Sequence, residues 1–338
     1  MTGYAATGFD LVLAALILAT AGLAISVRDL FAAVVFFIVY GIFVALAWLR
    51  LGAIDVALTE AALGAGLTGV LLIGAVARLA RNLVERRPEG SGEGGLLAAP
   101  PVSRAASPAA RIPAMLGSAG ISAVLGWAFL AQPADEGLRG PVAANLASSG
   151  VTNPVTAVLL NFRGWDTLLE SVVLLAALTG VWALARDEDW GLRPGLRQHA
   201  RAAGVLATFG RLLPPFGLLL GVYLVWVGAS RPGGAFQGGT VLAAVWLLVM
   251  MAGLMAPPRV TSPRIRAVLI AGPLLFLAIG LAGALAGTFL ALPPAIAKWV
   301  ILLIESGLTL SIAATLALLV LGPPQSPATP AGHTRDRP

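Results

Sequence analysis

Residues 30–49 read LFAAVVFFIVYGIFVALAWL, a run of twenty residues without a charged side chain. A helix of about 20 mostly apolar residues is long enough to cross the hydrocarbon core of a bilayer. The whole chain has the same character, with 58% apolar residues, 11% charged residues and a mean hydropathy of +0.89. A soluble domain carries about 25% charged residues. The sequence therefore predicts an all-α, polytopic integral membrane protein.

Further apolar runs lie on both sides of this stretch. About nine transmembrane helices are predicted, at residues 9–27, 30–49, 54–78, 112–131, 166–185, 212–230, 238–256, 266–290 and 296–321. The first run follows no basic segment and precedes no cleavage motif, so we expect a retained helix rather than a signal peptide.

The basic residues of the connections divide unequally between the two sides of the membrane. With nine helices, one side holds five Lys and Arg residues, namely Arg50, Arg139, Arg163, Arg231 and Lys298. The other side holds the remaining seventeen of the 22. Because cytoplasmic loops carry the excess of basic residues, we predict an N-terminus outside and a C-terminus in the cytoplasm.

Several kinds of site are excluded by composition. The chain has no cysteine, which removes disulfides, thiolate metal sites and cysteine nucleophiles. Its two histidines, His199 and His333, lie in polar connecting segments, so no histidine metal cluster, metal or cofactor is expected. The net charge of +6 does not indicate a nucleic-acid partner, because the arginines are distributed by membrane side.

Two polar linkers group the helices as three, two and four. Gly, Pro, Ser and Arg dominate the first linker, as in flexible connections, and the second is charged. The predicted domains are a three-helix module at 1–80, a cytoplasmic linker at 81–111, a two-helix module at 112–186, a linker at 187–211, a four-helix module at 212–322 and a disordered tail at 323–338. Such a chain is either a fusion of formerly separate subunits or one domain with long loops.

Asp55 and Glu60 lie in the third apolar run, within LRLGAIDVALTEAALGAG at 49–66. A carboxylate at a helix centre costs about 2.5–3.5 kcal/mol on insertion scales and commonly marks an ion or proton route. A spacing of five residues puts the two side chains roughly 7 Å apart along a regular helix and on different faces. A π-bulge would bring them onto one face. Glu60 is therefore either a protonatable group in a helix of variable winding or a carboxylate neutralised by a neighbouring chain, and Asp55 is either functional or an interfacial cap.

Asp166 and Glu170 share one helix face in NFRGWDTLLE, residues 161–170. Asp166 is a candidate N-cap, with Arg163 as its ion-pair partner. Functional and structural roles both remain open for the two carboxylates.

Lys298 and Glu305 are seven residues apart in the last apolar run, roughly 10 Å along the helix axis. Lys298 can extend to the outer interface, either as a snorkelling side chain or as part of an ion route. Glu305 lies too deep for that, so we expect a functional or inter-subunit role.

The loop SRPGGAFQGGT, residues 230–240, is rich in glycine. Glycines allow positive φ, so we expect a tight re-entrant or interfacial hairpin. It has no phosphate-binding pattern. The candidate structural residues are Pro232, Gly233, Gly234, Phe236, Gly238 and Gly239.

Three segments resemble known subunits. RPGGAFQGGTVLAAVWLL and the helices around it, at about 212–322, resemble the MnhB/MrpB family of multisubunit Na⁺/H⁺ antiporters, whose hallmark is a PGGGFxGG loop; Ala235 replaces one of its glycines. Residues 8–80, with GAIDVALTEAALG, resemble the three-helix module of the large antiporter subunit and MbhD of membrane-bound hydrogenases. NFRGWDTLLE and its helix resemble the adjacent module, MbhE.

The resemblance implies a subunit of an Mrp-type antiporter module in a bacterial cytoplasmic (inner) membrane, not an enzyme. Its implied partners are a large antiporter-like subunit, a C-type or NuoK-like subunit, lipid, protons and Na⁺. The three-helix module is similar to NuoJ of complex I, in which a π-bulge gates a proton path. On that similarity, Glu60 is the membrane carboxylate, with Asp55 in the same acidic motif; Asp166 and Glu170 match the acidic positions of the second module.

Two other functions remain open. The same modules can belong to a redox-driven ion-pumping complex of the hydrogenase or formate-oxidising type, with the redox centres in other chains. The chain can also be a structural scaffold without an ion path of its own.

Overall fold

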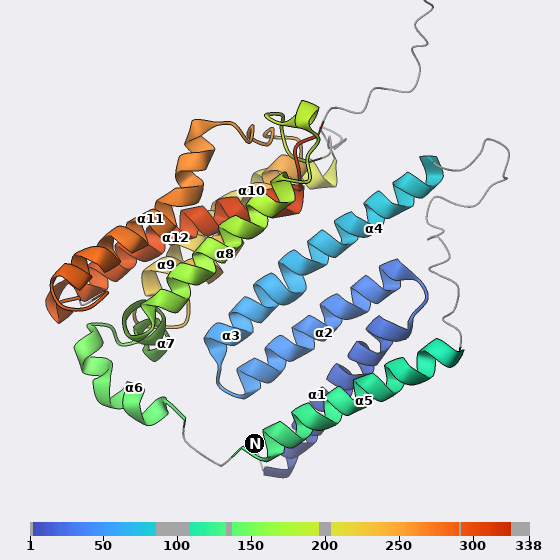
Figure 1. Ribbon diagram of the computed structural model, residues 1–338, viewed down its shortest axis with the longest axis horizontal. Helices are drawn as coiled ribbons and strands as arrows, with labels where there is room; N and C mark the ends of the chain where they lie inside the picture. Colours follow the sequence, from blue (N-terminus) through green and yellow to red (C-terminus); the bar gives the residue numbers. More distant parts are fainter. Residues whose placement is uncertain (1–2, 86–107, 133–136, 196–203, 291, 326–338) are drawn as a thin grey trace, which may run out of the picture. The chain divides into compact units, whose positions relative to one another are not determined.

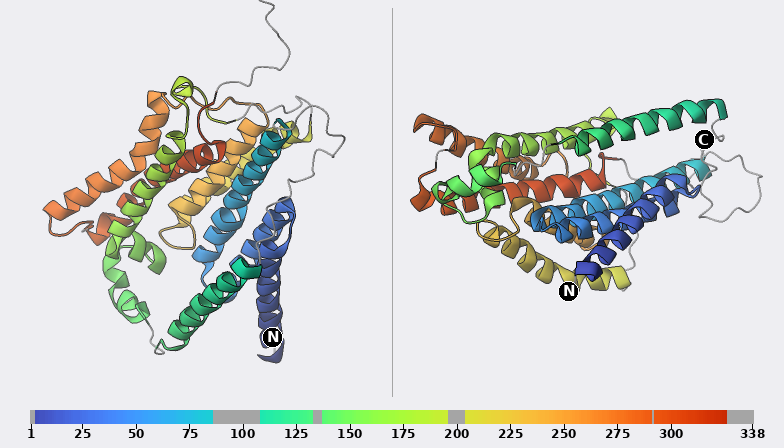
Figure 2. Two further views of the ribbon diagram at one scale, coloured as in Figure 1. Left: turned by 45° about the vertical axis from the view of Figure 1, so that its right-hand side comes forward. Right: turned by 90° about the horizontal axis from the view of Figure 1, so that it is seen from below.

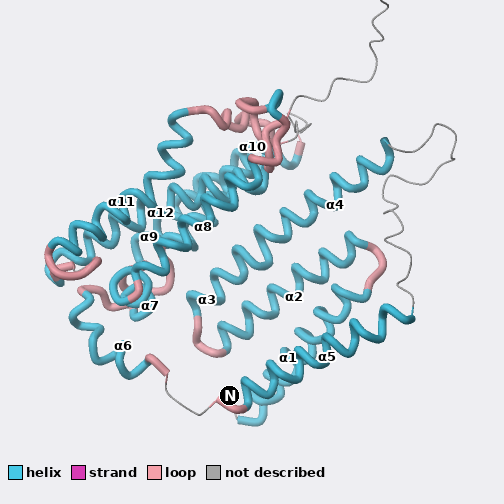
Figure 3. The backbone as a smooth tube through the Cα atoms, viewed as in Figure 1, coloured by secondary structure: helices cyan, strands magenta, loops and turns pink. Residues whose placement is uncertain are grey.

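The computed structural model describes residues 3–85, 108–132, 137–195, 204–290 and 292–325 (Figure 1). Within these ranges the chain forms helices and no strand, as the tube view shows (Figure 3). The all-α prediction is therefore confirmed. Of the linker predicted at 81–111, residues 86–107 lie outside the described residues, while helices continue to Glu85 and begin again at Pro108. Of the linker predicted at 187–211, residues 196–203 lie outside the described residues, and a helix begins at Val205. Of the tail predicted at 323–338, residues 326–338 lie outside the described residues.

The long helices follow the predicted spans closely. They are α1 (Gly3–Ser26), α2 (Leu30–Arg50), a continuous rod of α3 (Ile54–Thr59), a π-helix (Glu60–Leu67) and α4 (Thr68–Glu85), then α5 (Pro108–Leu130), α8 (Gly164–Trp182), α9 (Val205–Val227), α10 (Ala235–Met251), α11 (Pro263–Leu285) and α12 (Pro294–Leu321). Eight spans among the described residues are long and apolar enough to cross a membrane, whereas α10 has only 17 residues.

Short elements fill the connection between α5 and α8. They are α6 (Arg139–Asn145), a 3₁₀ turn (Leu146–Ser149), α7 (Pro154–Ala157) and a second π-helix (Val158–Phe162). Another 3₁₀ turn (Asp187–Asp189) follows α8. None of these elements is predicted from the sequence, because their segments are too short for a clear periodicity.

The chain divides into two compact units. The first comprises residues 1–40 and 72–145, and the second comprises residues 41–71 and 146–338. In the first unit the α5 span has no buried residue at all. An apolar surface of this kind is suited to contact with lipid or with other membrane helices.

The core of the second unit is built around α12. This helix packs against α8, α9, α10 and α11 (Figure 2). Of its most apolar stretch of 18 residues, 67% is buried. Its inner face carries Ile301, Ile304, Leu308 and Ile312, all almost fully buried. Such apolar side chains at helical spacing explain why α12 occupies the centre of the unit.

Small residues bring α11 and α12 into close contact. A Cβ atom added to Gly272 would lie 2.8 Å from the carbonyl oxygen of Gly307, so the two helices meet backbone to backbone. Membrane helices commonly pack in this way, since glycine lets the backbones approach. The crossing holds α12 where it presents Glu305, one turn from Thr309.

Candidate functional site

The third predicted helix is wound irregularly at Glu60. A π-helix runs from Glu60 to Leu67, between α3 and α4. The hydroxyl of Thr68 donates to the carbonyl of Leu63, five residues earlier, at 2.8 Å. A π-helix adds a residue per turn and is frequent at functional sites. Irregular winding of this helix is therefore confirmed, although the π-helix begins at Glu60 and does not lie between Asp55 and Glu60.

Gly64 provides the space in which the Glu60 side chain lies. A Cβ atom added to Gly64 would be 2.2 Å from Glu60 Oε1. The Glu60 side chain is half-buried, and its carboxylate has no hydrogen bond or ion pair with any residue that the structure describes. On the neighbouring turn, Ala65 packs against Gly41 of α2, where an added Cβ would be 3.0 Å from the Ala65 Cβ. Glycines thus permit both the irregular winding and the close helix contact.

Asp55 contacts the glycine loop from a distant part of the sequence. Its Oδ1 accepts a hydrogen bond from the backbone N–H of Gly233 at 2.9 Å. The side-chain amide of Gln237 donates to Thr59 Oγ1 at 3.2 Å and to the Asp55 carbonyl at 3.4 Å. Asp55 therefore joins α3 to the start of α10, and the interfacial-cap role considered from the sequence is wrong, since no side chain caps α3.

Glu305 reaches the same loop from α12. Its side chain is 3% exposed, and Oε1 lies 2.8 Å from the position of a Cβ added to Gly234 and 3.2 Å from one added to Gly228. Its Oε2 is buried without a hydrogen-bond partner among the described residues. The Thr309 hydroxyl donates to the Glu305 carbonyl at 2.7 Å. Two carboxylates thus flank one pair of glycines.

The loop itself is shorter than the sequence suggested. Gly233 and Gly234 have φ values of 153° and 114°, in the region that favours glycine, as expected. Phe236, Gly238 and Gly239 instead lie in the first turns of α10, so their placement in a loop is wrong. An added Cβ would lie 2.7 Å from Val225 Cγ2 at Gly238 and 2.8 Å from Ile312 Cγ2 at Gly239. Gly238 and Gly239 are therefore needed for close packing of α10. Pro232, which does lie in the loop, is half-buried.

The segment before α7 holds the other side of the loop. The Asn153 amide donates to the carbonyls of Gly228 and Arg231, both at 3.0 Å, while its Oδ1 caps α7 by accepting from the Val155 N–H at 2.9 Å. The Thr156 hydroxyl donates to Gly228 O at 2.6 Å. Asn153 was not among the residues predicted from the sequence, although an Asn-Pro pair is a recognisable helix-start signal.

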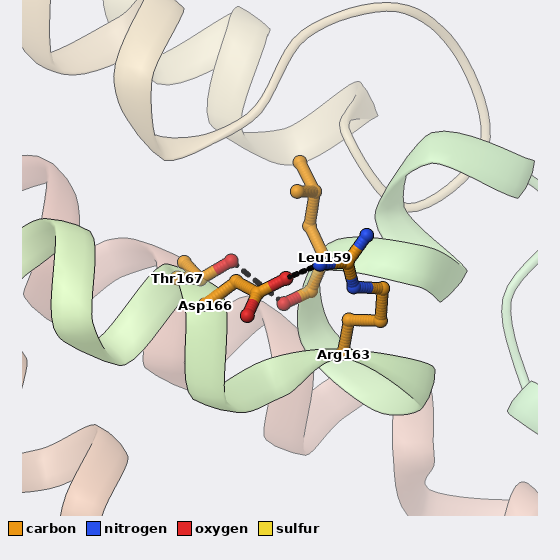
Figure 4. Close-up of polar contacts among 4 residues, drawn as sticks. All are labelled: Leu159, Arg163, Asp166 and Thr167. Carbon is orange, nitrogen blue, oxygen red and sulfur yellow. Dashed lines mark hydrogen bonds and ion pairs between the residues drawn. The ribbon is translucent and has the colours of Figure 1, made fainter.

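Asp166 lies at the surface, in an ion pair with Arg163 (Figure 4). The two side chains are 2.6 Å apart, as predicted, but they are 51% and 60% exposed. The proposed N-cap role of Asp166 is wrong, because α8 begins at Gly164 with Arg163 as its N-cap residue. Nearby, Thr167 donates to the Leu159 carbonyl at 2.7 Å and ties α8 to the preceding π-helix (Figure 4).

Glu170 and Lys298 are both exposed in this chain. The Lys298 ammonium lies 5.8 Å from the ring of Trp299, whose ring in turn meets that of Trp226 edge-on. Lysine and tryptophan together are typical of a membrane interface, which favours the snorkelling role. The structure therefore brings together Asp55, the loop and Glu305, while Asp166, Glu170 and Lys298 make no contact with that group among the described residues.

No cluster of three potential metal-ligating side chains occurs within the described ranges. The arrangement offers carboxylates, backbone groups and one side-chain amide. Such groups can bind and release a proton or hold a small cation without a resident cofactor.

Two family models match the chain. Residues 15–81 match the MbhD family of MBH subunits, and residues 205–323 match a domain related to the MnhB subunit of Na⁺/H⁺ antiporter. Both matches agree with the resemblances seen in the sequence. The likeness of the middle module to MbhE stays a prediction. No curated protein matches the chain.

Two solved structures are similar. The Mrp complex from Dietzia sp. DQ12-45-1b is 24% identical with a TM-score of 0.71; the alignment covers 95% of this chain but 35% of that one, and it shows the shared fold. The membrane-bound sulfane sulfur reductase, an archaeal respiratory membrane complex, is 26% identical with a TM-score of 0.47 and covers 62% of this chain and 98% of that one. The chain is therefore a multi-pass membrane protein that fuses an MbhD-like domain to an MnhB-like domain.

Proposed function

We propose that the chain is a membrane subunit of an Mrp-type cation/proton antiporter module. The observation that carries the proposal is the pair of family matches, which lie in order along one polypeptide. The fold shared with a chain of the Mrp complex supports it. The alignment covers about a third of that chain's length. In such a module the chain works with other membrane subunits. Its partners are a large antiporter-like subunit and a C-type subunit, in a bacterial cytoplasmic membrane.

Within this module, the chain binds and releases a proton at Glu60. A half-buried carboxylate without a partner in the described structure stands at the first residue of a π-helix. Changing the winding there between α and π rotates the side chains that follow, which makes or breaks a water-filled path beside Glu60. Glu60 binds a proton in one winding and releases it in the other. Na⁺ is the cation that is exchanged for the proton.

Two measurements test this function. Co-purification of the tagged full chain, followed by mass spectrometry, should recover antiporter-like membrane subunits. Recovery of the chain by itself would contradict the proposal. Membrane vesicles carrying Glu60→Gln should lose most of their Na⁺-driven ΔpH, whereas Glu188→Gln, which removes an exposed carboxylate paired with Arg186, should retain it. Full activity with Glu60→Gln would remove the proton step and favour a scaffold role.

A redox-driven complex is the second candidate, favoured by the match to the MbhD family. It predicts that Fe–S or NiFe subunits co-purify with the chain. The same mass spectrometry therefore separates the two candidates by the partners it finds.

A further inference from the structure

Glu305 is a buried carboxyl group that the proposed step at Glu60 does not use. It lies in the middle of α12, is 3% exposed, and its Oε2 has no hydrogen-bond partner in the described part of the chain. Burying a carboxylate with one oxygen left without a partner is costly, and a group in that position normally takes up a proton or meets a positive partner. No Lys or Arg forms an ion pair with it among the described residues.

The side-chain oxygen of Gln237 also lies close to Gly234. The position of a Cβ added to Gly234 is 2.8 Å from Glu305 Oε1 and 3.7 Å from Gln237 Oε1. The amide nitrogen of Gln237 is already used, since it donates to Thr59 Oγ1 at 3.2 Å. The unsatisfied atom is therefore Glu305 Oε2, which has no hydrogen-bond partner among the described residues, and protonation of the carboxyl group removes the charge that burial makes costly there.

We propose that Glu305 is a proton-binding site of the MnhB-like domain. The inference rests on the proposed function for its use in transport, but the site itself rests on the geometry alone. In its protonated state Glu305 is a neutral acid inside the core. On release of the proton, the carboxylate is left against the backbone of Gly228 and Gly234.

Asp55 connects this site to the MbhD-like domain. Its Oδ1 accepts a hydrogen bond from the N–H of Gly233, and a Cβ added to the next residue, Gly234, would lie 2.8 Å from Glu305 Oε1. On α12 itself, Lys298 is exposed, and among the helices packed on α12, α10 has no charged residue. The charged side chains of the other helices also lie at the surface, namely Asp166 and Glu170 of α8, Arg211 of α9, and Arg264 and Arg266 of α11.

Two ionised carboxylates on adjacent glycines repel each other in a medium of low dielectric constant. Loss of the Glu305 proton therefore favours movement of the loop away from one of the two helices. Since Asp55 is five residues before Glu60, such a movement acts on the same rod that contains the π-helix. The proposal thus links a proton in one domain to the winding of a helix in the other.

An apolar reagent can test the site in the full chain. A cavity of about 270 Å³ is lined by Leu302, Ser306 and Thr309 of α12 together with apolar residues of α9. N,N′-dicyclohexylcarbodiimide is apolar and reacts with carboxyl groups in their protonated form. Membranes containing the full chain, with its partner subunits, are treated with it at a series of pH values, and the adduct on the α12 peptide is measured by mass spectrometry.

We expect an adduct at Glu305 whose yield falls about tenfold per pH unit once the group ionises. Glu305→Gln should abolish the adduct, and Glu188→Gln, which removes an exposed carboxylate away from α12, should leave it unchanged. Asp55→Asn removes the charge but keeps an oxygen for the Gly233 N–H, so it should shift the pH at which labelling is lost. An unlabelled Glu305 at every pH, or a labelling profile that Asp55→Asn leaves in place, overturns the proposal.

The labelling requires no transport, so its outcome is separate from that of the proposed function. If Glu305 is labelled as expected but no antiporter-like subunit co-purifies, the proton site stands and the antiporter assignment fails. If the partners are found and Glu305 is not labelled, the antiporter assignment stands and the proton site fails.

Discussion

Asp55 Oδ1 accepts a hydrogen bond from the backbone N–H of Gly233 at 2.9 Å, although 178 residues separate them in sequence. This contact joins the irregular helix of the MbhD-like domain to the glycine loop of the MnhB-like domain. Both partners belong to the same compact unit of the chain. The two domains therefore share one structural core in their acidic and glycine-rich segments, and substitutions around that core should have measurable effects.

Replacing Gly234 by alanine should destabilise the loop. The residue has a φ of 114°, and its new Cβ would lie 2.8 Å from Glu305 Oε1. Backbone strain alone costs about 1–3 kcal/mol at such a position. Thermal unfolding of the purified chain in detergent should show a clearly lower unfolding temperature for Gly234→Ala than for the wild type. Gly180→Ala is the matched control, since a Cβ at Gly180 of α8 meets nothing within 4 Å. Equal stability of the two variants would contradict the loop geometry.

Asn153 should contribute to the stability of the fold through its amide donors as well as through its helix cap. Asn153→Ala removes two hydrogen bonds to loop carbonyls and the cap of α7, and we expect a loss of about 2–4 kcal/mol. Asn153→Asp keeps the cap acceptor and removes the donors. In a denaturant titration, the free energy of unfolding of Asn153→Asp should be well below that of the wild type. If this variant is as stable as the wild type, only the cap matters.

Filling the space beside Glu60 should impair transport without removing the carboxylate. A Cβ at Gly64 would be 2.2 Å from Glu60 Oε1, so Gly64→Ala forces the side chain to move. We expect Na⁺-driven ΔpH in vesicles to fall toward the level of Glu60→Gln. Gly74→Ala, where an added Cβ meets nothing within 4 Å, serves as control. Unimpaired transport in Gly64→Ala would show that the position of the Glu60 carboxylate is not critical.

The Arg163–Asp166 ion pair should matter little for stability. Both side chains are more than half exposed, so solvent screens the 2.6 Å contact. A double-mutant cycle with Arg163→Ala and Asp166→Ala should give a coupling below about 1 kcal/mol. A coupling of several kcal/mol would indicate that another subunit buries this pair in the assembled complex.

The predicted orientation can be measured directly, because the chain has no cysteine. Ser230 and Thr261 are exposed residues in the connections before α10 and before α11. In intact cells a membrane-impermeant thiol reagent should label Ser230→Cys. The same reagent should label Thr261→Cys only after permeabilisation. The reverse pattern would invert the predicted topology.

The sequence by itself determined the helical membrane fold. Apolar runs such as residues 30–49 leave a chain in a bilayer no alternative to helices, because every backbone group must be satisfied within the segment. Those runs are local features, and most of the observed spans begin and end within a few residues of the predicted ones. The glycines after Glu60 also indicated where the winding could change, and the π-helix lies there.

Only the tertiary structure decided which polar groups meet. Asp55, Gly233 and Glu305 come from three distant segments, and no periodicity in the sequence relates them. The glycines of residues 230–240 looked alike in sequence. Gly233 and Gly234 adopt positive φ in the loop, whereas Gly238 and Gly239 allow close contacts of α10 with α9 and α12. The reason is physical: a hydrogen bond or a close approach depends on how separate helices pack, whereas the tendency of each segment to be a membrane helix depends on its own side chains.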